Sequence, residues 1–146
     1  MHIEKAQLAD IETLAELIMA FNAEEGIQNA LIDVMYALID SFKHPTLVAS
    51  YLAYHEQQII GYFHLTYTYS FEYLGVQAIL DELFLKPAFR AQGLATELLN
   101  LAALEAKQNG ANHLAGIISE QKPWLLKFYT HHGFKTLPYK PFTKRL

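Results

Sequence analysis

The sequence predicts a single α+β (α/β) domain over residues 1–146, in which a mixed, mostly antiparallel sheet of six to seven strands is flanked by four helices. Segments of period-two and of helical hydrophobic periodicity follow one another in the order β-α-α-β-β-β-α-β-α-β-β. A length of 146 residues fits one domain. A strand-helix-strand crossover in the second half implies a central parallel pair.

Two helices are expected near the start of the chain. A short strand is predicted at residues 3–6, and Asp10 is placed as the N-cap of the first helix, which ends near Gly26. The second helix, residues 31–42, must end before Pro45, because the residue preceding a proline avoids the helical region. The apolar stripes of both helices are interpreted as core.

A meander of three strands follows the helices. Residues 47–54 and 59–69 are rich in β-forming side chains and are separated by a polar turn, which predicts an antiparallel hairpin. The long strand 76–85 comes next. The aromatic side chains here either pack across these strands, or some of them line a pocket in which rings face a cationic amine: Tyr67, Tyr69, Phe71 and Tyr73.

The stretch 79–95 is predicted to hold a phosphate group. It consists of a buried strand, a loop and a helix start, and Pro87 ends the strand because it cannot donate to a sheet ladder. Gly93 allows the backbone to approach a ligand closely. The free N–H groups and the dipole of the following helix then favour an anion.

The last third of the chain completes the sheet. The helix after the loop ends at Gly110, and the nearly continuous apolar run 113–118 predicts a central strand parallel to 76–85. A last helix begins at Pro123 and stops at Gly133. Short terminal strands are expected at residues 134–137 and 142–144.

Two motifs in this order resemble one known family. Residues 90–95, Arg-Ala-Gln-Gly-Leu-Ala, match the Arg/Gln-x-x-Gly-x-Gly/Ala pattern of the GNAT superfamily of acetyl-CoA-dependent N-acetyltransferases, and they follow a Leu-x-Leu-x-Pro strand. Residues 128–134 resemble the family's closing Leu/Phe-Tyr-x-x-x-Gly-Phe. Residues 80–85 are similar to a strand of the diamine and spermidine/spermine acetyltransferase branch, with its two acids in reverse order.

The resemblance implies that acetyl-CoA is a co-substrate. It also implies a bulge that separates the strand 76–85 from its parallel neighbour, so that pantetheine occupies the gap, and a backbone N–H that polarises the thioester carbonyl. Lys122 stands where many members have an asparagine that contacts the cofactor. By the same resemblance, the cofactor-binding residues are Leu83, Phe84, Leu85, Arg90, Ala91, Gln92, Gly93, Leu94, Ala95, Thr96 and Tyr129.

Acyl transfer to an amine needs a group that removes a proton, since a primary amine has a pKa near that of lysine, about 10.4. Asp81 and Glu82 are the candidates, but the period of two sends them to opposite faces unless a bulge intervenes. Each is otherwise a solvent-facing charge. Tyr129 stands at the family's tyrosine position, which implies a general acid, although helical spacing alone places it in the core. Glu24 and Glu25 form either a solvated turn or an acidic lip that recognises an amine.

Composition excludes several other classes. The net charge of −4 argues against a nucleic-acid partner, and no apolar run approaches the length of a membrane span. The seven histidines show no metal-ligand spacing, so no metal is expected. The chain has no cysteine, and residues 1–5 lack the features of a signal peptide, which favours a cytoplasmic protein. A homodimer is expected by analogy with relatives.

Two functions therefore remain open. The first is an N-acetyltransferase that moves the acetyl group of acetyl-CoA to a primary amine of a small molecule or peptide by direct transfer in a ternary complex. The second is a catalytically silent CoA-binding or protein-interaction module on the same fold. The pairing of an acid at Asp81 or Glu82 with Tyr129 favours the enzyme. The sequence leaves the identity of the acceptor amine open.

Overall fold

The computed structural model describes residues 1–145, and the chain divides into two compact units at Gly116. The first unit, from Met1, contains the whole sheet together with the helices α1, α2 and α3. The second unit, from Ile117 onward, contains helix α4 (Pro123–His131). One domain over residues 1–146 stays a prediction.

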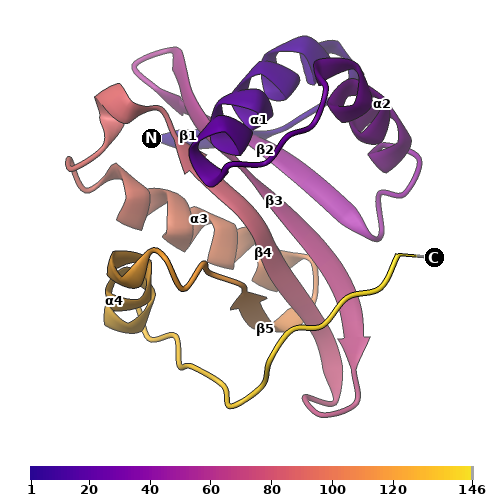
Figure 1. The fold of residues 1–146 in the computed structure, drawn as a ribbon, viewed down its shortest axis with the longest axis vertical. Coiled ribbons are helices and arrows are strands. Elements are labelled where there is room, and N and C mark those ends of the chain that lie inside the picture. Colours follow the sequence, from indigo (N-terminus) through magenta and orange to yellow (C-terminus); the bar gives the residue numbers. More distant parts are fainter. Residues whose placement is uncertain (146) are drawn as a thin grey trace. The chain divides into compact units, whose positions relative to one another are not determined.

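The sheet is mixed and mostly antiparallel, as predicted. Its strands lie in the order of the chain, and only the last pair, β4 with β5, is parallel. Figure 1 shows β3 and β4 as the longest strands, which run to a shared hairpin. The strands are β1 (His2–Lys5), β2 (Val48–His55), β3 (Gln58–Ser70), β4 (Gly75–Leu85) and β5 (Ala111–Gly116).

Helices cover both faces of the sheet. On one face, α1 (Ile11–Glu25) and α2 (Leu31–Ser41) lie side by side and share a core with Tyr62 and Phe84 (Figure 1). On the other face lies α3 (Leu94–Gln108), against β3, β4 and β5. Tyr51 of β2 lies on the α3 side of the sheet. Burial raises the pKa of Tyr51, and the nearby Glu105 of α3 raises it further. This α-β-α layering is what the predicted apolar stripes require.

Local signals fixed most boundaries to within a residue or two. Gly26, with φ of 71°, ends α1 in the left-handed conformation that glycine tolerates. Asp10 lies at the N-cap position of α1, but its carboxylate accepts a hydrogen bond of 2.8 Å from the backbone N–H of Gln7 and so closes the preceding 3₁₀ turn, Leu8–Asp10. In residues 1–145, no helix has the length and apolar character to cross a membrane.

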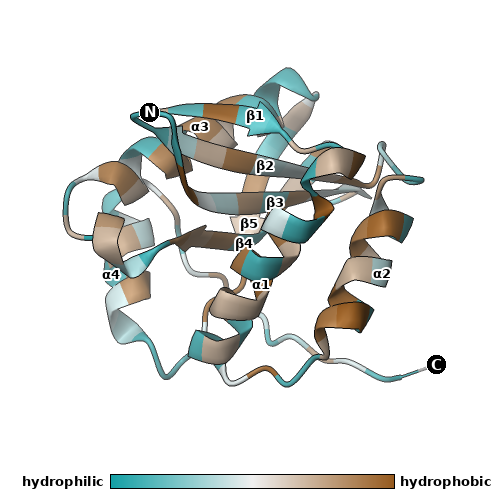
Figure 2. Cartoon of the chain, turned by 90° about the horizontal axis from the view of Figure 1, so that it is seen from above, coloured by the Kyte–Doolittle hydropathy of each residue, from teal (hydrophilic) through white to brown (hydrophobic). Residues whose placement is uncertain are grey.

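The helix α2 is apolar beyond the face that it buries. Val34 and Leu38 are buried in the core, whereas Leu31, Ile32 and Tyr36 are exposed. The brown turns of α2 in Figure 2 show this broad apolar surface. The sequence pattern located the helix correctly, but it did not distinguish its buried stripe from this exposed one.

Two expectations about the sheet were wrong. The strand predicted at 113–118 is β5, and it lies at the edge of the sheet instead of its centre. It contacts α3, and within residues 1–145 β4 alone pairs with it. The segments 134–137 and 142–144 form no strands, so the described part of the chain has five strands instead of six to seven. Pro138 follows the first segment and Pro141 precedes the second, and each lacks the N–H that a ladder requires.

Candidate active site

A β-bulge in β4 sets the geometry of the site. His64 of β3 pairs with Glu82 of β4, but the next residue, Leu65, pairs with Leu80, so Asp81 is an extra residue without a partner. In a regular strand, Asp81 and Glu82 would point to opposite faces. With the bulge, both side chains line the same cavity. The bulge implied by the family resemblance is therefore confirmed.

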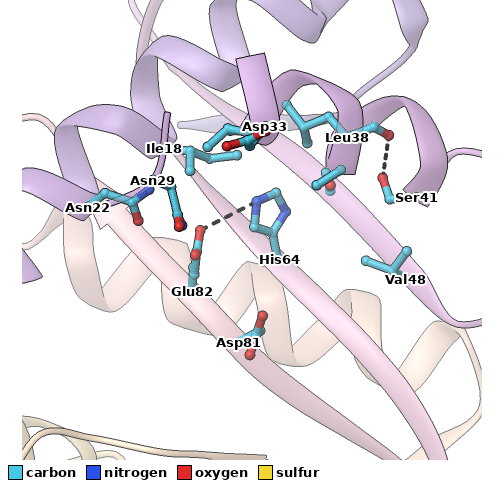
Figure 3. Close-up of a pocket in the computed structure, with 13 residues that line it drawn as sticks. Ile18, Asn22, Asn29, Asp33, Leu38, Ser41, Val48, His64, Asp81 and Glu82 are labelled. Carbon is cyan, nitrogen blue, oxygen red and sulfur yellow. Dashed lines mark hydrogen bonds and ion pairs between the residues drawn. The ribbon is translucent and has the colours of Figure 1, made fainter. Parts of the chain in front are cut away.

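The cavity has a volume of about 470 Å³ and lies between the helices α1 and α2 and the sheet. Figure 3 shows Asp33 on α2 and the sheet residues His64, Asp81 and Glu82 around it. Three carboxylates contribute to the lining, and no lysine or arginine does so among the described residues. Apolar side chains complete the walls, including Ile18, Val34, Leu38 and Val48. The cavity thus suits a small, positively charged ligand with an apolar part.

Glu82 belongs to a buried hydrogen-bonded group. The hydroxyl of Tyr62 donates to Glu82 Oε2 at 2.7 Å, and Nε2 of His64 lies 3.5 Å from the same oxygen (Figure 3). Burial raises the pKa of Glu82, the hydrogen bond from Tyr62 lowers it, and the neighbouring Asp81 raises it again. The net pKa of Glu82 lies above its ordinary value, which brings this carboxyl closer to the range in which it can exchange protons at neutral pH.

Two buried polar atoms at the cavity lack a partner. His64 is 8% exposed, and burial lowers its pKa from 6.5 to about 4, so its ring is neutral at pH 7. In the described part of the chain, His64 Nδ1 and Asn22 Nδ2 make no hydrogen bond, although Asn22 is only 3% exposed. Both residues line the cavity. Because buried polar groups are nearly always satisfied, these two indicate a place where a ligand binds.

The loop between β4 and α3 has the geometry of an anion site. After a short 3₁₀ turn, Pro87–Phe89, both Ala91 and Gly93 have positive φ angles, 59° and 81°. A Cβ added at Gly93 would meet no atom within 4 Å, so the space in front of this backbone is open. Helix α3 begins at Leu94, and the N–H groups of Leu94 and Ala95 have no acceptor within the helix, whereas those of Thr96 and Glu97 donate to the carbonyl of Gly93. Successive N–H groups in such a loop form a concave surface for a phosphate.

The side chain of Arg90 is engaged by other residues of the chain. Its Nε donates to the carbonyl of Leu85 at 2.8 Å, and its Nη2 donates to both carboxylate oxygens of Glu24 at 2.8 and 2.9 Å. Its guanidinium lies over the ring of Phe84. The side chain therefore ties the loop to α1 and to the end of β4. Glu24 is neutralised by this pair, which argues against Glu24 as a free acidic lip.

The backbone of β4 beyond the bulge has one free edge in the structure. The parallel pairing of β4 with β5 ends at Leu80 and Gly116. Among the described residues, no strand pairs with that side of Leu83, Phe84 or Leu85, although β3 pairs with the other side. This separation is the feature implied for a pantetheine channel. Apart from the carbonyl of Leu85, which accepts a hydrogen bond from Arg90, the N–H and C=O groups on the open side are available to an extended ligand.

Tyr129 lies on α4, in the second unit. It is half-buried, its ring packs edge-on against Phe134 at 5.3 Å between centroids, and it also contacts Phe128. Burial raises the pKa of Tyr129, so its hydroxyl stays protonated at neutral pH. Lys122 occupies the N-cap position of the same helix. The roles of both residues stay predictions.

The sequence analysis missed four residues on which this site depends: Asn22, Asp33, Tyr62 and His64. Tyr62 and His64 belong to an aromatic strand, in which alternation suggested packing, and Asn22 lies within the apolar stripe of α1. Only the register of β3 against β4 brings His64 opposite Glu82.

Among residues 1–145, no group of three or more histidine or acidic side chains could hold a metal ion.

Comparison with known proteins agrees with this geometry. Residues 48–136, more than half of the chain, match the family model described as the acetyltransferase (GNAT) domain. The chain therefore belongs to the GNAT acetyltransferase family. No curated protein matches the sequence.

Solved structures show the same fold. A probable acetyltransferase has a TM-score of 0.85 at 22% identity, covering 100% of this chain and 98% of its own. A predicted acetyltransferase from Clostridium acetobutylicum, solved with acetyl-CoA, has a TM-score of 0.79 at 18% identity, covering 98% and 95%. A transcriptional regulator from Bacillus halodurans C-125 has a TM-score of 0.80 at 20% identity, covering 99% of both chains. At these identities the likeness establishes the fold alone.

The buried, neutral His64 generates a prediction about acid stability. Its pKa is about 4 in the folded protein and 6.5 when exposed, so between these pH values only the unfolded chain binds the proton. The free energy of unfolding should thus fall as pH drops from 6.5 to 4, by about 3 kcal/mol from this residue. His64→Asn should remove that part of the pH dependence, measured by urea denaturation at several pH values.

The same substitution at His2, which is exposed, serves as the control. If the stability curves of the wild type and His64→Asn run parallel between pH 4 and 6.5, His64 is not held neutral by burial.

Proposed function

We propose that the protein is an N-acetyltransferase that moves the acetyl group of acetyl-CoA to a primary amine by direct transfer in a ternary complex. The observation that carries this proposal is the bulge, because it turns Asp81 and Glu82 into one cavity on the strand that leads into the phosphate loop. Membership of the GNAT family supports acetyl-CoA as the donor. The acetyl-CoA in the Clostridium acetobutylicum structure is consistent with that choice.

The residues of this chain fit acetyl-CoA at two places. The open space before Gly93 and the free N–H groups at the start of α3 suit the pyrophosphate. The unpaired edge of β4 at residues 83–85 suits the extended pantetheine, and its amides can polarise a carbonyl oxygen. When bound, acetyl-CoA supplies an acetyl group already activated as a thioester. Gln92, whose side chain donates to the carbonyl of Ala88 at 3.0 Å, and Thr96 belong to the same proposed site.

Glu82 is the favoured proton acceptor for the amine. Tyr62 holds its carboxylate at 2.7 Å, and its raised pKa makes it a better base than an exposed acid. Asp81 is the less favoured choice, because it is exposed. Glu82 takes the proton that the amine nitrogen gives up as it bonds to the acetyl carbon, and Tyr129 gives its hydroxyl proton to the departing sulfur.

A catalytically silent module is the second candidate, since a transcriptional regulator shares this fold. The experiment that separates the two is release of free thiol from acetyl-CoA across polyamines, amino sugars, amino acids and peptides. Amine-dependent release supports the enzyme. Tight CoA binding with no release over the whole panel would favour the silent module.

A homodimer, a cytoplasmic location and the absence of nucleic-acid and membrane partners stay predictions.

The phosphate loop generates a prediction about CoA affinity. Gly93→Val places a side chain in the open space before the loop and strains a backbone with φ of 81°. Since each hydrogen bond to a charged group contributes about 1.5–3 kcal/mol, we expect CoA affinity to fall roughly tenfold to hundredfold, measured by calorimetry.

Gly110→Val is the matched control. Gly110 has φ of 87° at the other end of α3, and a Cβ there also meets no atom within 4 Å. It should impose similar strain without weakening CoA binding. Equal CoA affinities for the two variants would remove the Gly93 loop from the site.

The assigned acid and base generate a kinetic prediction. Tyr129→Phe keeps the ring but removes the proton, so kcat for thiol release should fall roughly 10²- to 10⁴-fold with CoA affinity nearly unchanged. Glu82→Gln should lose most activity at lower pH, where unprotonated amine is scarce, and should recover in part as pH approaches the pKa of the amine. Tyr36→Phe, at an exposed position on α2, is the control.

Near-normal turnover of Tyr129→Phe, under conditions where chemistry limits the rate, would mean that another group protonates the sulfur. A constant ratio of wild-type to Glu82→Gln activity at all pH values would likewise exclude Glu82 as the base.

A further inference from the structure

The charge of the cavity deepens the proposed function by defining the acceptor. Asp81 and Glu82 enter the cavity from β4, and Asp33 enters it from α2. Among the described residues no basic side chain lines the cavity, and Arg90, close in sequence to β4, already pairs with Glu24. A single amine needs one carboxylate to take its proton. Asp33, the acid on α2, is therefore not needed for the proton transfer itself.

A second, independent observation marks this cavity as a ligand site. Asn22 and His64 are both more than nine-tenths buried, both line the cavity, and Nδ2 of the first and Nδ1 of the second have no partner in residues 1–145. If His64 directs its Nε2–H at Glu82, 3.5 Å away, then Nδ1 is left with a lone pair that accepts an N–H. A neutral His64 adds no positive charge that would repel a cation.

Uncharged residues line the rest of the cavity, and they include the polar side chains of Asn29, Ser41 and Ser50 as well as apolar ones. Ile18 of α1, Val34 and Leu38 of α2 and Val48 of β2 lie around the cavity together with the polar residues. Figure 3 shows Asp33 on the helix side and Glu82 on the sheet side of His64. A ligand that pairs with both acids therefore needs charge at two places, and the apolar residues of the lining favour an aliphatic stem between them.

We propose that the acceptor is a small aliphatic amine with a second positive charge and no negative charge, and that Asp33 holds the second charge. This inference rests on the proposed N-acetyltransferase function. One amino group meets Glu82 and Asp81, where its proton is removed, and the other stays charged at Asp33. A free amino acid is disfavoured, because its carboxylate would face three acids.

The test compares three acceptors of similar length with the wild-type protein: 1,4-diaminobutane, butylamine and 4-aminobutyrate. We expect kcat/KM for the diamine to exceed that for butylamine by about fivefold and that for 4-aminobutyrate by more, since one added ion pair is worth about 1 kcal/mol. Diamines with three to six carbons should show an optimum length. Equal or better use of butylamine or 4-aminobutyrate would overturn the proposal while leaving an acetyltransferase.

Asp33→Asn tests the assigned residue, and Asp40→Asn is its matched control. Asp40 lies on the same helix, is exposed and pairs with Lys43 outside the cavity. The preference for the diamine over butylamine should shrink about threefold or more in Asp33→Asn and should persist in Asp40→Asn. The same loss in both variants, or in neither, would overturn the role of Asp33.

A binding measurement separates this inference from the proposed function. Calorimetry in the presence of CoA reports whether 1,4-diaminobutane binds more tightly than butylamine, whether or not turnover occurs. Preferential binding without thiol release would support the dicationic ligand and refute the enzyme. Thiol release with a monoamine preference would support the enzyme and refute the dicationic acceptor.

Discussion

One extra residue in β4 governs the chemistry of this protein. The bulge at Asp81 breaks the alternation of side chains between β3 and β4, so two neighbouring acids reach the same cavity. Just past Leu80 the parallel pairing with β5 also ends, which leaves one backbone edge of the strand open. The bulge and the end of this pairing therefore define the acidic cavity proposed for the acceptor and the open strand edge proposed for the donor.

The site has a cost that the fold must offset. Tyr62 is fully buried with its hydroxyl on Glu82, and His64 and Asn22 keep unpartnered polar atoms near the core. Such groups destabilise a folded protein unless a ligand or water satisfies them. The core of α1, α2 and the sheet, which includes Tyr62 and Phe84, supplies the compensating apolar burial. This arrangement is typical of a functional site held by a rigid scaffold.

Most elements could be predicted from the sequence, because hydrophobic periodicity and helix-ending glycines are local signals. The position of β5 could not, since an apolar run does not tell whether both edges of a strand are paired. The Gly93 loop could be predicted, because its sequence motif is local. The role of His64 could not be predicted. Its contact with Glu82 depends on the register between β3 and β4 and on the extra residue in β4, and the alternation of side chains along a strand determines neither.

Amide hydrogen exchange of β4, with and without CoA, tests the central claim most directly. If the open edge beyond the bulge receives the pantetheine, the amides in residues 83–85 that face away from β3 should exchange more slowly when CoA is bound, while the amides paired with β3 change little. Unchanged exchange in residues 83–85, at a CoA concentration that calorimetry shows to be saturating, would contradict the account.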